Sequence, residues 1–276
     1  MKSMPTVLIN NLDHYYEEAG KGEAIIFVHG AFADGRIWEP QWQYFGSKYR
    51  VVRYDLRGHG RTGISRLEHY SMATFADDLA LLLNELQIES TIICGLSWGG
   101  SIAQAYAVRQ PGRLKALIMA GSMVAIDLTP KDKFLFRVMV PWWLMSLAIR
   151  SMSVQNFTRF SFSLAHLTMG KYWLSRDEHA RQYLEQCMWQ MDGNEYLKIW
   201  EAMYGFHILP LENITCPTLV LNGELESKNI LRHSAEILRR IPHAESKIIP
   251  GAQHGVNIEE PQLFNKIVEQ FLQSIN

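Results

Sequence analysis

The sequence predicts an α/β protein with a mostly parallel, doubly wound sheet. Short apolar runs that end at or near a glycine recur along the chain, and helical patterns separate most of them. Unbroken apolar strands are typical of a parallel sheet whose two faces are both covered by helices. The predicted strands are 7–9, 14–17, 24–29, 49–54, 91–94, 117–120, 218–221 and 247–249.

Four helices are predicted between and after these strands. Apolar residues recur at helical spacing, with Ser71 or Thr74 as a possible N-cap of the first helix, and Pro111 and Gly112 end the second. The predicted helices are 75–86, 99–109, 230–241 and 261–275.

The segment between residues 123 and 215 breaks this alternation, because it has helical patterning and no convincing strand. It is rich in tryptophan and methionine, which fits either packing on the core or lining a pocket for an apolar substrate. The sequence therefore predicts a core domain made of residues 1–122 and 216–276. A helical cap, or lid, of residues 123–215 is inserted before the last two strands.

Composition argues against several partners. The 276 residues include 27 basic and 28 acidic side chains without a long basic run, so a nucleic-acid partner is not expected. Cys94, Cys187 and Cys216 are too widely spaced for a zinc site, and we expect neither a metal nor an organic cofactor. Arg137 and Pro141 interrupt the most apolar stretch, and the first residues do not resemble a signal peptide. We therefore expect a cytoplasmic protein without stable membrane insertion.

The most specific signal is the segment from Gly95 to Gly100, which reads G-L-S-W-G-G. It follows a predicted strand and opens a predicted helix, as a G-x-S-x-G nucleophile elbow requires. Glycines allow the close backbone approach of such a turn, and the helix N-terminus favours developing negative charge. Ser97 is therefore the candidate nucleophile.

Three further motifs accompany the elbow in order along the chain: His29-Gly30 after one strand, a D-L-R-G-H-G run from Asp55, and G-A-Q-H ending at His254. With the elbow, they resemble the α/β-hydrolase superfamily, in particular its lidded, esterase-like serine hydrolases. The resemblance covers nearly the whole chain and implies the α/β-hydrolase fold.

The resemblance also implies roles for individual residues. His254 would be the general base, and the backbone N–H groups of Trp98 and of either Ala31 or Phe32 would form the oxyanion hole, with Ala31 ranked first. His29 would hold its own loop. The side chains of Phe32, Trp98, Trp142 and Trp143 are expected to line the substrate pocket.

The triad acid has three candidates. The resemblance implies an acid three residues after Gly223, where Glu226 stands, and we rank this residue first. Glu224 in the same loop competes with it, and Asp127 is a further alternative because some relatives place the acid after the preceding strand.

The implied activity is hydrolysis of a small to medium, largely apolar carboxylic ester through an acyl-enzyme on Ser97. A serine at this position disfavours the branches with an aspartate nucleophile, such as epoxide hydrolases and haloalkane dehalogenases. Lactone hydrolysis and C–C bond hydrolysis are alternatives, although Leu96 stands where C–C hydrolases often have asparagine. A small-molecule receptor with the same fold is the alternative from another functional class.

Overall fold

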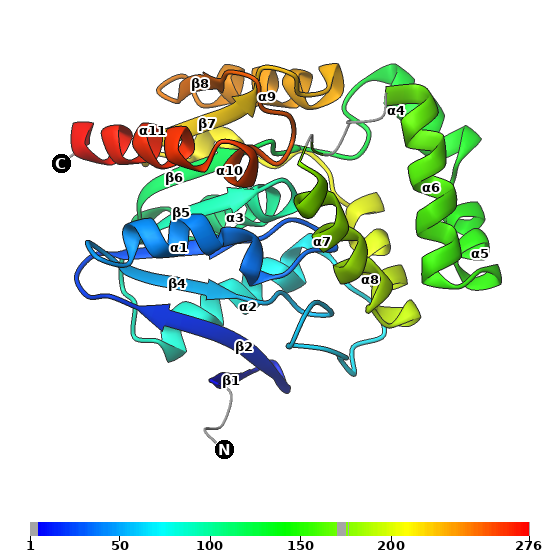
Figure 1. Cartoon of the computed structure of the whole chain (residues 1–276), viewed down its shortest axis with the longest axis horizontal. Helices are drawn as coiled ribbons and strands as arrows, with labels where there is room; N and C mark the ends of the chain where they lie inside the picture. Colours follow the sequence, from blue (N-terminus) through cyan, green and yellow to red (C-terminus); the bar gives the residue numbers. More distant parts are fainter. Residues whose placement is uncertain (1–4, 170–174, 176, 276) are drawn as a thin grey trace.

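A computed structural model describes residues 5–169, 175 and 177–275. Within these residues, eight strands form one sheet in the order β1-β2-β4-β3-β5-β6-β7-β8 (Figure 1). The strands are β1 (Thr6–Ile9), β2 (Leu12–Ala19), β3 (Ala24–Val28), β4 (Arg50–Tyr54), β5 (Thr91–Leu96), β6 (Leu114–Ala120), β7 (Thr218–Gly223) and β8 (Glu245–Ile249).

Strands β3 to β8 pair in parallel, and β2 joins β4 in antiparallel register. The predicted doubly wound sheet is therefore confirmed, with an antiparallel β1–β2 extension at one edge. Because parallel strands all end at the same edge, the loops after β3, β5, β6, β7 and β8 gather at one side of the molecule.

Helices cover both faces of the sheet. Alternate residues of β3 show the two faces: Ile26 packs in a core with α2, α3 and α9, whereas Phe27 packs in a core with α1 and α11. The helices around the sheet are α1 (Glu39–Phe45), α2 (Met72–Glu85), α3 (Trp98–Arg109), α9 (Lys228–Arg240), α10 (Val256–Glu259) and α11 (Pro261–Ser274).

Helix α1, which begins in a W-E-P-Q segment, was not predicted from the sequence. Pro40 lies in its first turn, a position that proline favours, and this was the available signal. Seven residues are too few for hydrophobic periodicity to stand out.

The described residues between β6 and β7 contain helices and no strand, as the sequence predicts. The helices are α4 (Pro130–Phe134), α5 (Trp142–Ser151), α6 (Val154–Met169), α7 (Glu178–Trp189) and α8 (Gly193–Tyr204), with a π-helical turn at Leu135–Met139. This helical insertion lies beyond the edge of the sheet where the parallel strands end (Figure 1). Among the described residues, no helix combines bilayer-spanning length with sufficient apolar character.

A buried ion pair fixes the loop after β4. The Arg57 guanidinium is fully buried and donates from Nε and Nη2 to the two carboxylate oxygens of Asp78 on α2, each at 2.7 Å. Burial alone would raise the pKa of Asp78, but hydrogen bonds and the Arg57 charge outweigh burial and lower that pKa. Two parallel hydrogen bonds also fix the orientation of the guanidinium, and with it the loop.

Replacing Asp78 with asparagine tests this anchor. Asp78→Asn leaves the buried Arg57 charge without its counter-charge and is expected to lower the free energy of unfolding by about 3–5 kcal/mol. Its neighbour Asp77 pairs with Arg109 at the surface, where both side chains are about half exposed. Asp77→Asn should therefore change the free energy by less than about 1 kcal/mol. Chemical denaturation measures both, and equal losses would contradict the anchor role.

Candidate active site

Ser97 lies in a strained turn between β5 and α3. Its backbone has φ 54° and ψ −118°, a region that side-chain-bearing residues rarely occupy and that often marks a functional site. A Cβ on Gly99 would collide with the carbonyl of Val28, and a Cβ on Gly95 would collide with the backbone of Gly99. The Ser97 N–H donates to the Ala120 carbonyl at 2.7 Å. The local sequence thus folds as the nucleophile-elbow motif requires.

His254 and Glu226 meet at the same edge of the sheet. His254 follows β8 and Glu226 follows β7, and His254 Nδ1 lies 2.7 Å from Glu226 Oε2. The other carboxylate oxygen, Oε1, accepts a hydrogen bond of 2.7 Å from the Ser227 backbone N–H. Both carboxylate oxygens are therefore engaged, and the Glu226 side chain is only 2 % exposed.

Gly121, at the end of β6, connects this pair to the serine turn. A Cβ on Gly121 would come within 3.0 Å of His254 Nδ1 and 3.3 Å of Glu226 Oε2, and the preceding residue, Ala120, accepts the hydrogen bond from Ser97. Ser97, His254 and Glu226 thus converge around the end of β6. Among the described residues, no hydrogen bond joins Ser97 Oγ to His254, and such contacts often tighten only when substrate binds.

The opposite charges of Glu226 and His254 shift the pKa values of these two residues in opposite directions. Burial alone would lower the pKa of His254, but the Glu226 charge and hydrogen bond outweigh burial and raise that pKa. Burial alone would raise the pKa of Glu226, but the His254 charge and the hydrogen bonds from His254 and Ser227 lower it. The pair therefore favours an ionised carboxylate beside an imidazole that accepts a proton readily.

The two alternative acids lie elsewhere. Glu224 Oε2 accepts a hydrogen bond of 2.9 Å from the Gly251 backbone N–H, and Asp127 pairs with Arg137 at 2.9 Å. Within the described part of the chain, neither carboxylate contacts His254. The geometry therefore brings Glu226, and not its competitors, to the imidazole.

The loop after β3 supplies backbone N–H groups near Ser97. A Cβ on Gly30 would lie 4.0 Å from Ser97 Oγ, so this loop passes close to the hydroxyl. Phe32 has a strained φ of 64°, and its N–H donates to His59 Nε2 at 3.0 Å. That bond occupies the Phe32 N–H, which leaves the Ala31 N–H as the better placed donor. Trp98 is the first residue of α3, so the hydrogen-bond ladder of the helix does not use its N–H.

Two buried histidines hold this loop in place. His29 Nδ1 lies 2.7 Å from the Gly30 carbonyl, while His29 Nε2 accepts from the Leu56 N–H at 2.9 Å. His59 Nδ1 lies 2.8 Å from the Arg57 carbonyl. A ring nitrogen beside a carbonyl must donate, and one beside an N–H must accept, so both rings are neutral. Burial lowers the pKa of both, to about 3 for His59. The expectation that His29 holds its loop is confirmed.

The four aromatic residues expected to line the pocket do not all lie together in the structure. Phe32 and Trp142 pack against one apolar cluster of the insertion, whereas Trp98 is fully buried in the core of the domain. Phe32 stacks on Tyr196 of α8 with ring centroids 4.6 Å apart. Trp142 packs near Tyr204 of the same helix at 5.3 Å. Trp143 points outward and is 67 % exposed, so the structure does not bring it to Phe32 and Trp142. Adjacent helical residues differ by about 100° in direction, which explains the separation.

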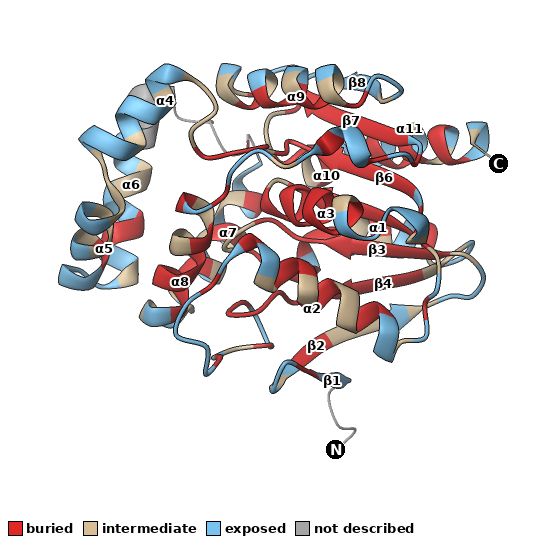
Figure 2. Ribbon diagram, turned by 180° about the vertical axis from the view of Figure 1, so that it is seen from behind, coloured by how far each residue is buried: buried red, intermediate tan, exposed pale blue. Residues whose placement is uncertain are grey.

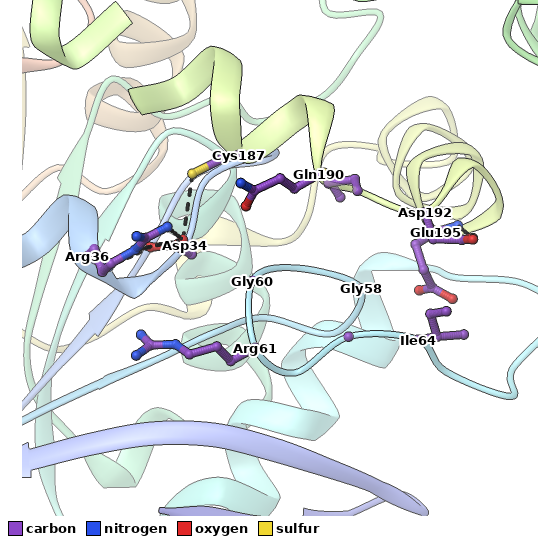
Figure 3. A pocket seen from close by; sticks show the side chains of 12 residues that line it. Asp34, Arg36, Gly58, Gly60, Arg61, Ile64, Cys187, Gln190, Asp192 and Glu195 are labelled. Carbon is purple, nitrogen blue, oxygen red and sulfur yellow. Dashed lines mark hydrogen bonds and ion pairs between the residues drawn. The ribbon is translucent and has the colours of Figure 1, made fainter. Parts of the chain in front are cut away.

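A cavity of about 420 Å³ lies between the loop after β3, the loop after β4 and helices α7 and α8 (Figure 3). Asp34 lies at its wall, where Tyr183 Oη of α7 donates to the Asp34 carboxylate at 2.8 Å and Cys187 Sγ lies 3.6 Å away. Ser97, His254 and Glu226 do not line this cavity. The contacts of Asp34 instead tie the loop to the helical insertion, and no sequence motif predicts this connection.

Across residues 5–169, 175 and 177–275, no group of three or more histidine, cysteine or acidic side chains is arranged to hold a metal ion.

Known proteins share both the sequence pattern and the fold. A family model described as alpha/beta hydrolase fold matches residues 23–261. The chain is 26 % identical to 3-oxoadipate enol-lactonase 2 of Acinetobacter baylyi, over 92 % of this chain and 90 % of the relative. An enol-lactonase from Burkholderia xenovorans superposes with a TM-score of 0.81 at 24 % identity, over 98 % of this chain and all of the other. A thermophilic esterase from Thermogutta terrifontis gives a TM-score of 0.80 at 22 % identity, over 98 % and 97 %. These similarities support a hydrolase, and the chain belongs to the alpha/beta hydrolase fold family.

Proposed function

We propose that this protein is a serine hydrolase that cleaves a carboxylic ester through an acyl-enzyme on Ser97, with His254 as general base and Glu226 as the orienting acid. The observation that carries the proposal is the 2.7 Å contact between His254 Nδ1 and Glu226 Oε2 beside the strained Ser97 turn. A nucleophile, a base and a group that orients the base are the three parts that this chemistry needs.

The proposed mechanism follows from the hydrogen-bond partners. Because Nδ1–H of His254 donates a hydrogen bond to Glu226, the lone pair of the imidazole is on Nε2, where it takes the Ser97 proton as Oγ attacks the ester carbonyl. The N–H groups of Ala31 and Trp98 stabilise the oxyanion that forms. The His254 imidazolium then protonates the leaving alcohol. A water molecule, activated by the same histidine, releases the acid and restores Ser97.

Residues 123–215 are proposed to form a cap over this site, with residues 1–122 and 216–276 as the catalytic core. Phe32 is the next residue after Ala31, the proposed oxyanion donor, and its ring stacks on Tyr196 of α8. One wall of the site is therefore aromatic and belongs partly to the cap. Such a wall favours a small to medium, largely apolar substrate. The cap would also exclude water from the acyl-enzyme.

Lactone hydrolysis is the second candidate, because a lactone is a cyclic ester and two of the similar proteins are enol-lactonases. The same residues would open the ring without loss of a separate alcohol. Rates on p-nitrophenyl acetate, butyrate and octanoate, compared with rates on unsubstituted lactones of matched carbon number, separate the two. A preference for open-chain esters supports the leading proposal, and a preference for lactones supports the second.

Removing the Ser97 hydroxyl tests the nucleophile. Ser97→Ala should lower kcat on p-nitrophenyl butyrate by on the order of 10⁴–10⁶ while the protein stays folded, because no other group replaces the attacking oxygen. A fluorophosphonate probe should label the Ser97 peptide of the wild type and fail to label this variant. Ser47→Ala, at an exposed serine, is the control and should keep both activity and labelling. Near wild-type turnover by Ser97→Ala would reject the assignment.

The raised pKa of His254 sets the expected pH dependence. The base must be neutral to accept the Ser97 proton, so kcat/KM should be low in acid. It should rise with pH through an inflection above the ordinary histidine pKa. Glu226→Gln removes the negative charge that raises this pKa. Its inflection should therefore move to lower pH, and its plateau rate should fall by about 10²–10⁴.

Glu224→Gln is the matched control for this experiment, since Glu224 lies in the same loop and contacts Gly251. It should keep both the inflection and the plateau of the wild type. A large loss of rate in Glu224→Gln with little change in Glu226→Gln would reverse the ranking of the two acids.

A further inference from the structure

We propose that the outer surface of α4–α6 docks on an anionic phospholipid surface. This surface, called the outer flank here, is formed by the exposed side chains between residues 130 and 164. The proposal goes beyond ester hydrolysis and does not depend on Ser97.

Apolar exposure is concentrated on the outer flank. Ten of the seventeen large hydrophobic side chains that are exposed in the described part of the chain lie between residues 134 and 164. The segment from α4 to α6, with its π-helical turn at Leu135–Met139, carries these side chains. It lies on the side of the molecule away from the sheet, and much of it is exposed (Figure 2). Exposed apolar side chains gathered on one surface indicate an interaction site, whereas scattered ones do not.

The exposed side chains follow helical spacing. Trp143 and Leu147, four residues apart on α5, are 67 % and 58 % exposed, while Ile149 on another side of the helix is buried. On α6, Phe160 and Leu164, also four residues apart, are 60 % and 52 % exposed, while Thr158 on the opposite side of the helix is buried. The inner sides of these helices thus pack in the protein while their outer sides present apolar stripes. An amphipathic helix of this kind suits the plane of a lipid interface, where tryptophan is a favoured anchor.

The net charge of the outer flank indicates which kind of partner it contacts. Residues 130–164, which span the outer flank, contain five basic residues and one acidic residue, whereas the rest of the chain contains 22 basic and 27 acidic residues. Lys131, Lys133 and Arg150 are exposed, and none of them has an ion pair within the described residues. An apolar surface with unopposed positive charge complements the negative surface of a membrane with anionic lipids.

The same charge argues against pairing of two copies through this surface. A two-fold contact places the same patch on both sides, so the basic side chains would face each other. No described helix can cross a bilayer, so contact with lipid through this surface is peripheral.

Vesicle sedimentation tests the proposal directly. The full chain is mixed with sucrose-loaded vesicles of phosphatidylcholine alone or of equal parts phosphatidylcholine and phosphatidylglycerol. Binding is expected to the second kind only, and about 0.5 M salt should largely release it because salt screens the attraction. Leu147→Glu places a negative charge among the apolar side chains and should weaken partitioning by on the order of tenfold or more.

Leu8→Glu is the matched control, because Leu8 on β1 is 64 % exposed and lies far from the outer flank (Figure 1). It should bind like the wild type, as should Ser97→Ala, which separates docking from catalysis. Circular dichroism checks that each variant is folded.

Three results would overturn the proposal. They are absence of binding to the anionic vesicles, equal binding to both kinds of vesicle, and equal loss in Leu8→Glu and Leu147→Glu. A wild-type dimer in solution that Leu147→Glu dissociates would also overturn it, by assigning the outer flank to a second copy.

Discussion

The strained backbone at Ser97 is the constraint on which the site depends. A residue with φ 54° and ψ −118° is stable only where its surroundings leave no alternative, and here β5, β3 and α3 approach so closely that Gly95 and Gly99 have no room for a side chain. Because β5 lies between β3 and β6, the same turn is flanked by the loop that carries Ala31 and by the end of β6 at Gly121. The position of one strand end therefore determines what can meet the hydroxyl: the backbone N–H groups on one side and the imidazole on the other.

Three histidines lie around this edge of the sheet, and their partners give them different chemistry. His29 and His59 each have one ring nitrogen beside a backbone carbonyl and the other accepting from a backbone N–H, so burial keeps them neutral and lowers their pKa. His254 instead faces a carboxylate, and its pKa is raised. All three rings are shielded from solvent to some degree, so the choice of partner decides which one takes up a proton. A proton removed from Ser97 would thus go to His254, whose charged form is stabilised, while the other two keep their donor and acceptor roles and hold the loop still.

Much of this arrangement was predictable from the sequence, and the rest depended on side-chain direction. Apolar runs ending at glycine predicted the parallel sheet. The order of the Ser97 and His254 motifs along the chain predicted the edge of the sheet where the two residues meet. Glu226 and Glu224 could not be separated with certainty because both lie in one tight loop. In the structure, the turn after β7 directs Glu224 to the Gly251 N–H and Glu226 to the His254 imidazole. Trp142 and Trp143 are adjacent in sequence, but the packing of α5 on α8 turns only the first toward Tyr204. Such directions follow from tertiary contacts, which periodicity alone does not encode.

The helical insertion has two halves that are held in different ways. On α8, the buried Glu195 carboxylate accepts hydrogen bonds from Tyr70 and from the Ser65 N–H, which tie the helix to the loop after β4. Lys198 on the same helix donates to the Ser65 and Leu67 carbonyls of that loop. On α7, Tyr183 donates a hydrogen bond to Asp34, which lies in the loop that carries the proposed oxyanion residue. Cys187 on the same helix contacts the same carboxylate (Figure 3). Buried polar contacts of this kind fix position, because breaking one leaves a charge without a partner. The α4–α6 half is held mainly by apolar contacts to α7 and α8 and exposes much of its surface. A second surface could therefore contact that half without disturbing the hydrogen bonds that hold Ala31 and Phe32 beside Ser97.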